Sequence, residues 1–469
     1  MREIQTDYLV IGAGATGMAF VDALVSESDA DVVLVDRRHR AGGHWLDAYP
    51  FVRLHQPSPC YGVSSTQLGE NRIDEAGPNS GFYERAGAAE ICAYYGRVLD
   101  EVLLPTGRVR FHGMTEYRGA DGGDHHLQSH LTGETVRVTV RRRLVDATYI
   151  ESVVPSRHTP KFEVGDGAQV VSPNALVDLD EAPSGYTIVG AGKTGMDTCG
   201  WLLEQGVDPD RIRWIKPREA WLFDRVFMQP LDLVGSYMQM QARWMEAAAQ
   251  CQGGADMALR LEESGVFVRV DRDVDATMQR GATISMSEVD ALRTIQNVVR
   301  QGYVRHVSGE RVDMDGGTLA SDPKQVYVDC TAEGVQIKAL RPVFEPGRIT
   351  MQYVTPGYAC WSGATLGLVE ALRDDDRERN RLCAPVCFSG EVADLDEWAR
   401  VSMLGLIGRD AEPDLAAWTN ESRLNPSKGV RDHIDEAQVL DALGSLGQHV
   451  GPALANLERL KGADTVATP

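Results

Sequence analysis

A short glycine string occurs twice in the chain, and it constrains the fold more than any other feature. The two copies are Gly12-Ala13-Gly14-Ala15-Thr16-Gly17 and Gly190-Ala191-Gly192-Lys193-Thr194-Gly195. Each copy follows a short strand-like run, residues 8–11 or 186–189, and precedes a segment in which apolar residues recur at helical spacing. A strand, a tight glycine turn and a helix in this order are typical of a dinucleotide-binding βαβ unit. The sequence therefore predicts an α/β fold with two such units.

The first copy has every feature that such a unit needs. Gly12 permits the tight turn, Gly14 lets the backbone approach a pyrophosphate, and Gly17 lets the helix pack closely on the strand. The N–H groups at the start of the helix attract phosphate oxygens. The next strand, residues 32–35, ends at Asp36, an acid placed to accept hydrogen bonds from an adenosine ribose. These features predict a bound dinucleotide.

The second copy differs at the corresponding strand end. Residues 211–215 are followed by Lys216, Pro217 and Arg218 in place of an acid. Basic groups suit the 2′-phosphate of NADP better than the free ribose of NAD, so Arg218 is predicted to bind that phosphate. The alternative is a duplicated unit that has lost its ligand.

Charge and composition exclude several other classes of protein. The chain of 469 residues has a formal net charge of −21, which argues against the clustered Lys and Arg of nucleic-acid binding. No run of about 18 apolar residues is present to span a membrane, and the first residues do not resemble a signal peptide. We therefore expect a cytoplasmic protein without a membrane or nucleic-acid partner. Its eight cysteines are scattered, and no metal site is expected.

The rest of the chain divides into strand-rich and helical segments. Residues 108–140 are predicted to form an antiparallel meander of three strands, 109–117, 126–131 and 134–140. Residues 231–300 are rich in Met, Ala and Glu and are predicted to be a helical insertion. Residues 385–410 and 436–461 are predicted to be helices, and residues 411–427, which contain Pro413 and Pro426, to be irregular.

Three further segments resemble those of a known class of flavoprotein. Gly42-Gly43-His44-Trp45 resembles the GGxW turn that follows the first unit of the two-dinucleotide-binding flavoproteins. Asp146-Ala147-Thr148 resembles the Ala-Thr-Gly segment at which those proteins return to the flavin, with Tyr149 in place of the glycine, and Asp329-Cys330-Thr331-Ala332 resembles its second copy. Over residues 5–60, 140–220 and 320–335 the chain thus resembles the flavin-containing and N-hydroxylating monooxygenases. It departs from them in the FxGxxxH stretch, where His158 and Phe162 occur in the wrong order and spacing.

The resemblance implies a domain layout. An FAD-binding Rossmann-like domain would comprise residues 1–180 and 320–410, with a parallel sheet and the antiparallel meander. An NAD(P)-binding Rossmann-like domain, residues 181–319, would be inserted into it and carry the helical insertion. Residues 411–469 would form a C-terminal helical extension.

The resemblance also implies the cofactor contacts. FAD would be held by residues of the first unit and of the segments just named: Gly12, Ala13, Gly14, Thr16, Gly17, Asp36, Arg37, Gly43, His44, Trp45, Gln56 and Thr148. NADPH would be held by residues of the second unit: Gly190, Gly192, Lys193, Thr194, Gly195 and Arg218. Gln56 is included as a flavin-edge contact because residues 54–58 resemble the stretch that lines the flavin in N-hydroxylating members.

These assignments imply an oxidoreductase that uses FAD and NADPH. The favoured hypothesis is a monooxygenase in which reduced flavin binds O₂ and transfers one oxygen atom, through a C4a-(hydro)peroxide, to a small-molecule substrate. No catalytic acid, base or nucleophile is predicted. Two alternatives stay open: an FAD-dependent dehydrogenase or oxidase with a vestigial second site, and a non-enzymatic binding protein with a flavin fold. A disulfide reductase is disfavoured, since Cys60 has no partner near it in sequence.

Overall fold

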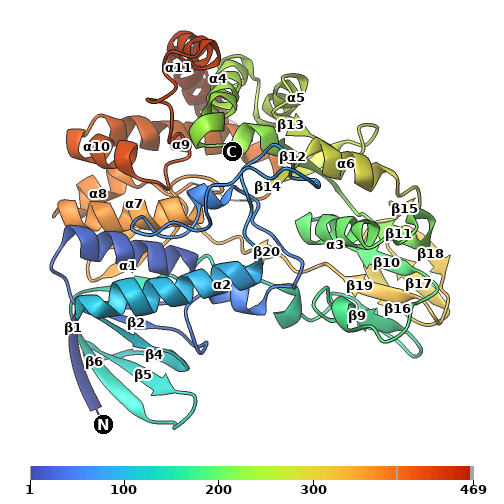
Figure 1. Cartoon of the computed structure of the whole chain (residues 1–469), viewed down its shortest axis with the longest axis horizontal. Helices are drawn as coiled ribbons and strands as arrows, with labels where there is room; N and C mark the ends of the chain where they lie inside the picture. Colours follow the sequence, from blue (N-terminus) through green and yellow to red (C-terminus); the bar gives the residue numbers. More distant parts are fainter. Residues whose placement is uncertain (1, 387–388, 465–469) are drawn as a thin grey trace.

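The computed structural model describes residues 2–386 and 389–464, and it contains two α/β regions beneath a group of helices (Figure 1). In the first region, strand β1 (Arg2–Ile11) lies between β2 (Val32–Val35) and β6 (Thr135–Asp146), and all three run parallel. The sheet continues with β3 (Val109–His112) beside β2, and with β22 (Arg348–Thr350) and β21 (Phe344–Glu345) beside β6. Every residue of β2 is buried, as expected for a parallel strand covered on both faces.

Two helices on this sheet pack unusually closely because of small residues. Helix α1 (Ala15–Glu27) follows the first glycine turn, and α7 (Ala359–Leu372) lies against it. A Cβ atom at Gly363 or Gly367 of α7 would lie 2.5 Å from a carbonyl oxygen of α1. These glycines therefore let the backbones of the two helices touch. Helix α2 (Ala88–Arg97) lies nearby in the same region (Figure 1).

The predicted antiparallel meander is present, but its first strand is divided. Strands β4 (Thr115–Asp121), β5 (Asp124–Ser129) and β6 pair antiparallel in sequence order. The segment predicted as one strand, residues 109–117, instead contributes β3 to the parallel sheet and only its end to β4. The break falls at Gly113 and Met114, where Met114 has a positive φ of 50° and a Cβ at Gly113 would meet the carbonyl oxygen of His39 at 2.9 Å. Tertiary contact with the His39 loop thus overrides a continuous strand pattern.

The second region repeats this plan on a smaller scale. Strand β10 (Tyr186–Val189) lies between β11 (Ile212–Ile215) and β19 (Val326–Asp329), with β15 (Val298–Val299) and β9 (Gln169–Val171) outside them, all parallel. Helix α3 (Lys193–Glu204) follows the second glycine turn. Strands β16 (Val304–Val307), β17 (Arg311–Met314) and β18 (Gly317–Ala320) form the antiparallel part, and β8 (Glu163–Val164) pairs with β16. The predicted repetition of the unit is confirmed.

The two connections between the regions run side by side. Strand β7 (Ser152–Val153) belongs to the outward connection and β20 (Gly334–Val335) to the return, and the two pair antiparallel. Each connection follows one of the paired segments noted in the sequence, Asp146-Ala147-Thr148 or Asp329-Cys330-Thr331-Ala332. The crossing point of the chain therefore lies next to both.

The segment expected to be a helical insertion is helical only in part. It contains α4 (Val234–Gln250), α5 (Gly254–Glu263) and α6 (Met286–Arg293). Between them lie β13 (Phe267–Val268) and β14 (Ala276–Ile284), which pair on either side of β12 (Glu219–Asp224). The strand content was missed because β14 is stabilised by pairing with a strand some 50 residues away in sequence, so tertiary pairing outweighs local propensity.

Five helices form a layer that we call the helical cap: α4, α5, α9 (Leu395–Asp410), α10 (Pro413–Glu421) and α11 (Ala437–Asp464) (Figure 1). Helix α11 matches the prediction. Of the helix predicted over residues 385–410, only residues 395–410 form α9, and residues 387–388 lie outside the described part. The prediction that residues 411–427 are irregular is wrong, because Pro413 occupies the first turn of α10, where proline is tolerated. Helix α8 (Asp376–Leu382) lies between α7 and α9, and residues 465–469 of the predicted extension lie outside the described part. Within that part, no helix combines the length and hydropathy needed to cross a membrane.

Candidate dinucleotide sites and a shared cavity

The first glycine turn has the geometry that its sequence predicts. Gly12 has φ of +103°, which favours glycine, and its N–H donates to the carbonyl of Val35 at 2.8 Å. A Cβ at Gly17 would lie 2.0 Å from the carbonyl oxygen of Gly12. Gly14 is the N-cap of α1, and no side chain caps this end of the helix. The N–H groups of the first helical turn are therefore available to an anionic ligand.

Asp36 is buried at the end of β2 and is tied to the turn itself. One carboxylate oxygen accepts a hydrogen bond from the N–H of Ala13 at 2.8 Å, and the other accepts one from the N–H of Arg38, also at 2.8 Å. Each oxygen still has a free lone pair for a ribose hydroxyl. Asp36 thus holds the turn in shape and lies where the predicted ribose contact is needed.

A cavity of about 300 Å³ opens beside this turn. Its walls include eight of the twelve residues predicted to hold FAD: Gly12, Gly14, Thr16, Asp36, Arg37, Gly43, His44 and Thr148. Ala13 and Gly17 belong to the turn without lining the cavity, and Arg37 forms an ion pair with Glu151 at its rim. Sequence reasoning missed Tyr117 and Arg348, which come from distant strands and line the same space.

The GGxW segment packs directly on the glycine turn. Gly43 has φ of +57°, and a Cβ there would lie 2.7 Å from the Cα of Gly14. The N–H of Gly42 donates to the carbonyl of Ala13 at 2.9 Å. Trp45 is buried, and its indole N–H donates to the hydroxyl of Tyr61 at 2.6 Å. Packing against the first glycine turn therefore explains why both positions are glycine, whether or not a ligand is bound.

The second turn has the same backbone plan as the first. Gly190 has φ of +135°, and a Cβ at Gly195 would lie 2.4 Å from the carbonyl oxygen of Gly190. Gly192 is the N-cap of α3, again without a side-chain cap. Among the described residues, and apart from its chain neighbours and its own helix backbone, no atom lies within 4 Å of the Cβ position of Gly192. This turn therefore also leaves its helix N-terminus open.

The basic groups after β11 are each matched by a carboxylate. Lys216 is buried and donates to both oxygens of Glu219 at 2.8 and 2.9 Å. Arg218 donates to both oxygens of Glu391 at 2.7 and 3.0 Å and twice to Thr277. Arg300, which follows the neighbouring strand β15, also donates to Glu219 at 2.9 Å. A 2′-phosphate at Arg218 would have to compete with Glu391 for the guanidinium, which the sequence pattern did not reveal.

Lys193 of the second turn belongs to a buried ionic cluster. Its ammonium forms an ion pair with Asp197 and lies 3.9 Å from Glu288. Glu288 also contacts Arg225 at 2.5 Å and Arg85 at 3.7 Å. Burial alone would raise the pKa of Glu288, but the cations Lys193, Arg225 and Arg85 outweigh it and lower that pKa to about 2. Glu288 is therefore ionised and ties the second turn to segments far away in sequence.

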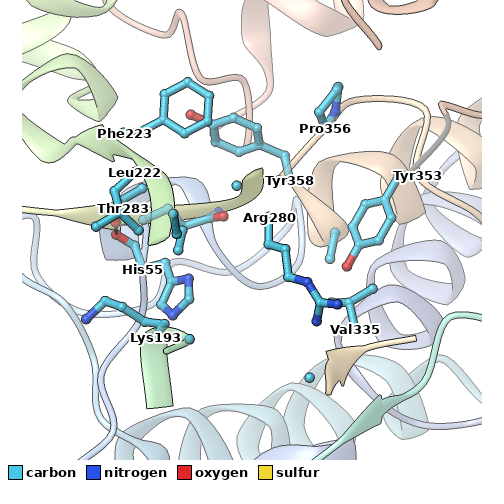
Figure 2. A pocket seen from close by; sticks show the side chains of 18 of the residues that line it. His55, Lys193, Leu222, Phe223, Arg280, Thr283, Val335, Tyr353, Pro356 and Tyr358 are labelled. Carbon is cyan, nitrogen blue, oxygen red and sulfur yellow. Dashed lines mark hydrogen bonds between the residues drawn. The ribbon is translucent and has the colours of Figure 1, made fainter. Parts of the chain in front are cut away.

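A larger cavity of about 940 Å³ brings residues of both predicted sites together. Trp45, His44 and Gln56 line it from the first region, and Gly190, Gly192, Lys193, Thr194 and Arg218 line it from the second. Figure 2 shows Lys193, His55 and Arg280 in one part of this space and Phe223 and Tyr358 in another. Burial and the nearby Lys193 lower the pKa of His55 to about 4, so this imidazole is neutral at pH 7.

Gln56 faces this larger cavity while its amide is anchored to the backbone. Its side-chain nitrogen donates to the carbonyl of Cys60 at 2.9 Å, and the residue is buried. The amide nitrogen is thus satisfied by backbone, and the contact of Gln56 with the flavin edge stays a prediction. The residues that sequence reasoning missed include Arg280, which lies in the segment expected to be helical, and Tyr358, which precedes α7; neither belongs to a local motif.

Comparison with known proteins agrees with this description. A family of NAD(P)-binding Rossmann-like domains matches residues 10–51. A steroid monooxygenase bound to NADP superposes with a TM-score of 0.50 at 13% identity, over 78% of this chain and 85% of that one. OTEMO in complex with FAD and NADP superposes with a TM-score of 0.50 at 14% identity, over 78% and 83%. The fold is that of the two-dinucleotide-binding flavin monooxygenases, as the resemblance predicts.

A relative in sequence places the chain more narrowly. "Uncharacterized protein Rv2000" of Mycobacterium tuberculosis is 44% identical over 428 residues, which is 90% of this chain and 78% of that protein. The chain belongs to the family of this mycobacterial protein.

Proposed function

We propose that the protein is an FAD-dependent, NADPH-using monooxygenase that acts on a small molecule with O₂. The observation that carries this proposal is the shared cavity, because residues of the GGxW turn and of the second glycine turn face the same space. Two dinucleotides held at the two turns would meet there, as hydride transfer between them requires. The domain layout proposed from the sequence, residues 1–180 with 320–410 and residues 181–319, is consistent with this arrangement.

The residues at each turn fit a pyrophosphate. A dinucleotide must approach the backbone more closely than a side chain allows, and Gly14 and Gly192 leave the Cβ position without a close protein neighbour: 3.5 Å to Gly43 for Gly14, and none within 4 Å for Gly192. Both helices that begin there lack a side-chain cap. The N–H groups of α1 would hold the FAD pyrophosphate, and those of α3 the pyrophosphate of NADPH. Asp36 would accept hydrogen bonds from the adenosine ribose of FAD.

The protein's part in the reaction would be to bind, orient and exclude water. Bound FAD and NADPH would supply hydride transfer and oxygen activation. Trp45, held by Tyr61, and Gln56, held by Cys60, would form a rigid wall beside the reacting rings. His55, being neutral, would add no charge to that wall, whereas Arg280 extends a guanidinium into the space (Figure 2). A preorganised, partly apolar wall strengthens electrostatic interactions and limits side reactions with water.

A second candidate function is favoured by one specific observation. Lys216 and Arg218, which follow β11, and Arg300, which follows β15, are all paired with carboxylates. If none of them is released to NADPH, the second turn would be vestigial and the protein an FAD-dependent dehydrogenase or oxidase. A flavin-fold binding protein without activity has less support, because the open helix N-termini have no structural purpose without a ligand.

The visible spectrum of the purified protein, followed during anaerobic addition of NADPH and then of air, tests the proposal. We expect a yellow protein that NADPH bleaches and that consumes O₂ when air is admitted. A yellow protein that neither NADPH nor NADH bleaches, but that a candidate substrate does, would favour the dehydrogenase or oxidase. A colourless protein that cannot be reconstituted with FAD would overturn both enzymatic functions.

A further inference from the structure

We propose that the part of the large cavity beneath the helical cap is the substrate chamber, and that it takes a bulky, uncharged, mainly apolar molecule carrying a hydrogen-bond-accepting oxygen. This inference rests on the proposed function and names the substrate class of the same site. It concerns the side of the cavity formed by Phe223, Tyr358 and the helices α4, α9 and α11. Lys193 and Arg280 lie in the other part (Figure 2).

The walls of this chamber are aromatic and aliphatic. Phe223 of β12 stacks on Trp244 of α4 with ring centroids 5.6 Å apart, and Trp398 of α9 packs edge-on against Trp244 at 5.6 Å. Met240 and Met245 of α4 and Met403 of α9 add flexible apolar surface. Such a surface has no fixed charge with which to hold a small ionic substrate, but it gains free energy from every apolar group that it removes from water.

One stripe of α9 leads from the protein surface to this chamber. Its cavity-lining residues recur at helical spacing and include Trp398, Ser402, Met403 and Leu406. Trp398 and Met403 are each 7% exposed, whereas Leu406 is 56% exposed. The hydroxyl of Ser402 donates to the carbonyl of Trp398 at 2.6 Å, so it presents little polarity to the cavity. The stripe therefore forms an apolar path as far as Leu406. Beyond it, Arg409, whose guanidinium donates to the carbonyl of Leu382 at 2.8 Å, and Asp410 also line the cavity.

The opposite helix supports the same entrance. Leu446 and Val450 of α11 line the cavity, and Ile407 beside Leu406 is 42% exposed. Neighbouring apolar side chains that are exposed to water often mark a binding surface. Capture of an apolar molecule at this entrance would explain the exposure of Leu406 and Ile407.

Two buried hydrogen-bond donors in the chamber lack partners. The hydroxyl of Tyr358 and the indole N–H of Trp398 make no hydrogen bond to any described residue, although both side chains are more than nine-tenths buried. Figure 2 shows the hydroxyl of Tyr358 turned toward Phe223. Burial raises the pKa of Tyr358 well above its ordinary value, so the hydroxyl keeps its proton and can only gain by donating it in a hydrogen bond. Buried donors without partners are costly, and an oxygen acceptor on the substrate would satisfy one of them.

Two exposed leucines of α9 provide a matched pair for testing the entrance. Leu406 lines the cavity, whereas Leu404, which is 43% exposed, does not. The probe is N-phenyl-1-naphthylamine, an uncharged apolar fluorophore, titrated into the purified full-length protein. We expect Leu406→Asp to weaken its binding at least tenfold and Leu404→Asp to leave it unchanged. Equal effects of the two variants, or no binding to the unsubstituted protein, would overturn the proposed entrance.

The accepting oxygen is tested with Tyr358→Phe and two probes of similar size. Prodan, a naphthyl ketone, offers a carbonyl oxygen, and N-phenyl-1-naphthylamine does not. We expect Tyr358→Phe to weaken Prodan binding about fivefold to tenfold, as for one lost hydrogen bond, and to shift its bound emission to the blue, with no change for the naphthylamine. Equal effects on both probes would show that Tyr358 only packs, and would overturn its role as donor.

These measurements are independent of the proposed redox activity, because probe binding needs neither NADPH nor O₂. If the probes behave as expected but NADPH and substrates leave the flavin unchanged, the chamber stands and the proposed function fails. If NADPH bleaches the flavin but neither probe binds, the proposed function stands and the apolar chamber fails.

Discussion

The two glycine turns of this protein share one backbone and differ in what surrounds it. In both, the first glycine has a positive φ, +103° at Gly12 and +135° at Gly190. In both, the last glycine faces the carbonyl of the first, with Cβ positions 2.0 Å and 2.4 Å from that oxygen. The two turns therefore share the same close packing of their last glycine on their first.

The surroundings differ at the end of the second strand. After β2, the carboxylate of Asp36 reaches back to the N–H of Ala13 and faces the smaller cavity. After β11, Lys216 is buried against Glu219. Within β11, the indole N–H of Trp214 donates a hydrogen bond to the carbonyl of Gly190 at 2.8 Å. The glycines thus give both turns the same shape, whereas the strand-end residue pairs with the turn itself after β2 and with a separate carboxylate after β11.

The largest expected effect comes from the last glycine of each turn. Gly17→Ala places a methyl group 2.0 Å from a backbone oxygen, and we expect a loss of about 3 kcal/mol or more in the free energy of unfolding, with a smaller loss for Gly195→Ala. Thermal unfolding of the purified variants measures this. Gly200→Ala is the control, because a Cβ at Gly200 in α3 meets nothing within 4 Å and should be neutral or slightly stabilising. An unchanged melting temperature for Gly17→Ala would contradict the close approach.

The middle glycines should affect ligands and leave the fold intact. A Cβ at Gly14 or Gly192 has no close protein neighbour, so alanine at either position should obstruct only an approaching pyrophosphate. We expect Gly14→Ala to weaken FAD binding about a hundredfold, or near 2.7 kcal/mol, and Gly192→Ala to weaken NADPH by a similar factor while FAD is retained. Titration of the apoprotein with FAD, and of the flavin signal with NADPH, measures the two. An undisturbed NADPH response in Gly192→Ala would favour a vestigial second site.

The burial of His55 beside the cations of the second turn should appear in the pH dependence of the free energy of unfolding. The folded pKa of His55 is about 4, below its ordinary value of about 6.5. Between pH 4 and pH 6.5, His55 is protonated in the unfolded chain and neutral in the folded protein. The free energy of unfolding therefore falls as the pH falls from 6.5 to 4. We expect His55→Gln to remove about 3 kcal/mol of that fall. Urea unfolding at several pH values measures it, with His126→Gln on the β5 hairpin as control; identical slopes in both variants would contradict the expectation.

The smallest expected effect is at Arg218. Because its guanidinium is occupied by Glu391 and Thr277, we expect Arg218→Ala to change the preference for NADPH over NADH by less than about threefold. Glu391→Gln would weaken that pairing and should move the preference further toward NADPH. A selective tenfold loss of NADPH affinity in Arg218→Ala would instead show that the 2′-phosphate displaces Glu391, as the strand-end pattern predicts.

Some of the missed features were out of reach of any local pattern. Strand β14 was hidden in a segment rich in helix-forming residues, because its partner β12 lies far away in sequence. Tyr358 and Arg280 enter the shared cavity from segments without a motif. The cluster of Lys193 and Glu288 with two buried arginines joins four distant segments, and no spacing rule connects them.

The two turns and the order of the elements around them could be read from the sequence alone. These depend on φ angles and on the absence of a Cβ atom, which act over a few residues and can be read from the residue types. The folded chain alone shows that the GGxW turn and the second glycine turn line one cavity, which basic groups are already paired, and that α9 opens an apolar path to that cavity. Those features depend on which distant surfaces meet, and burial and charge pairing at such contacts are properties of the folded chain.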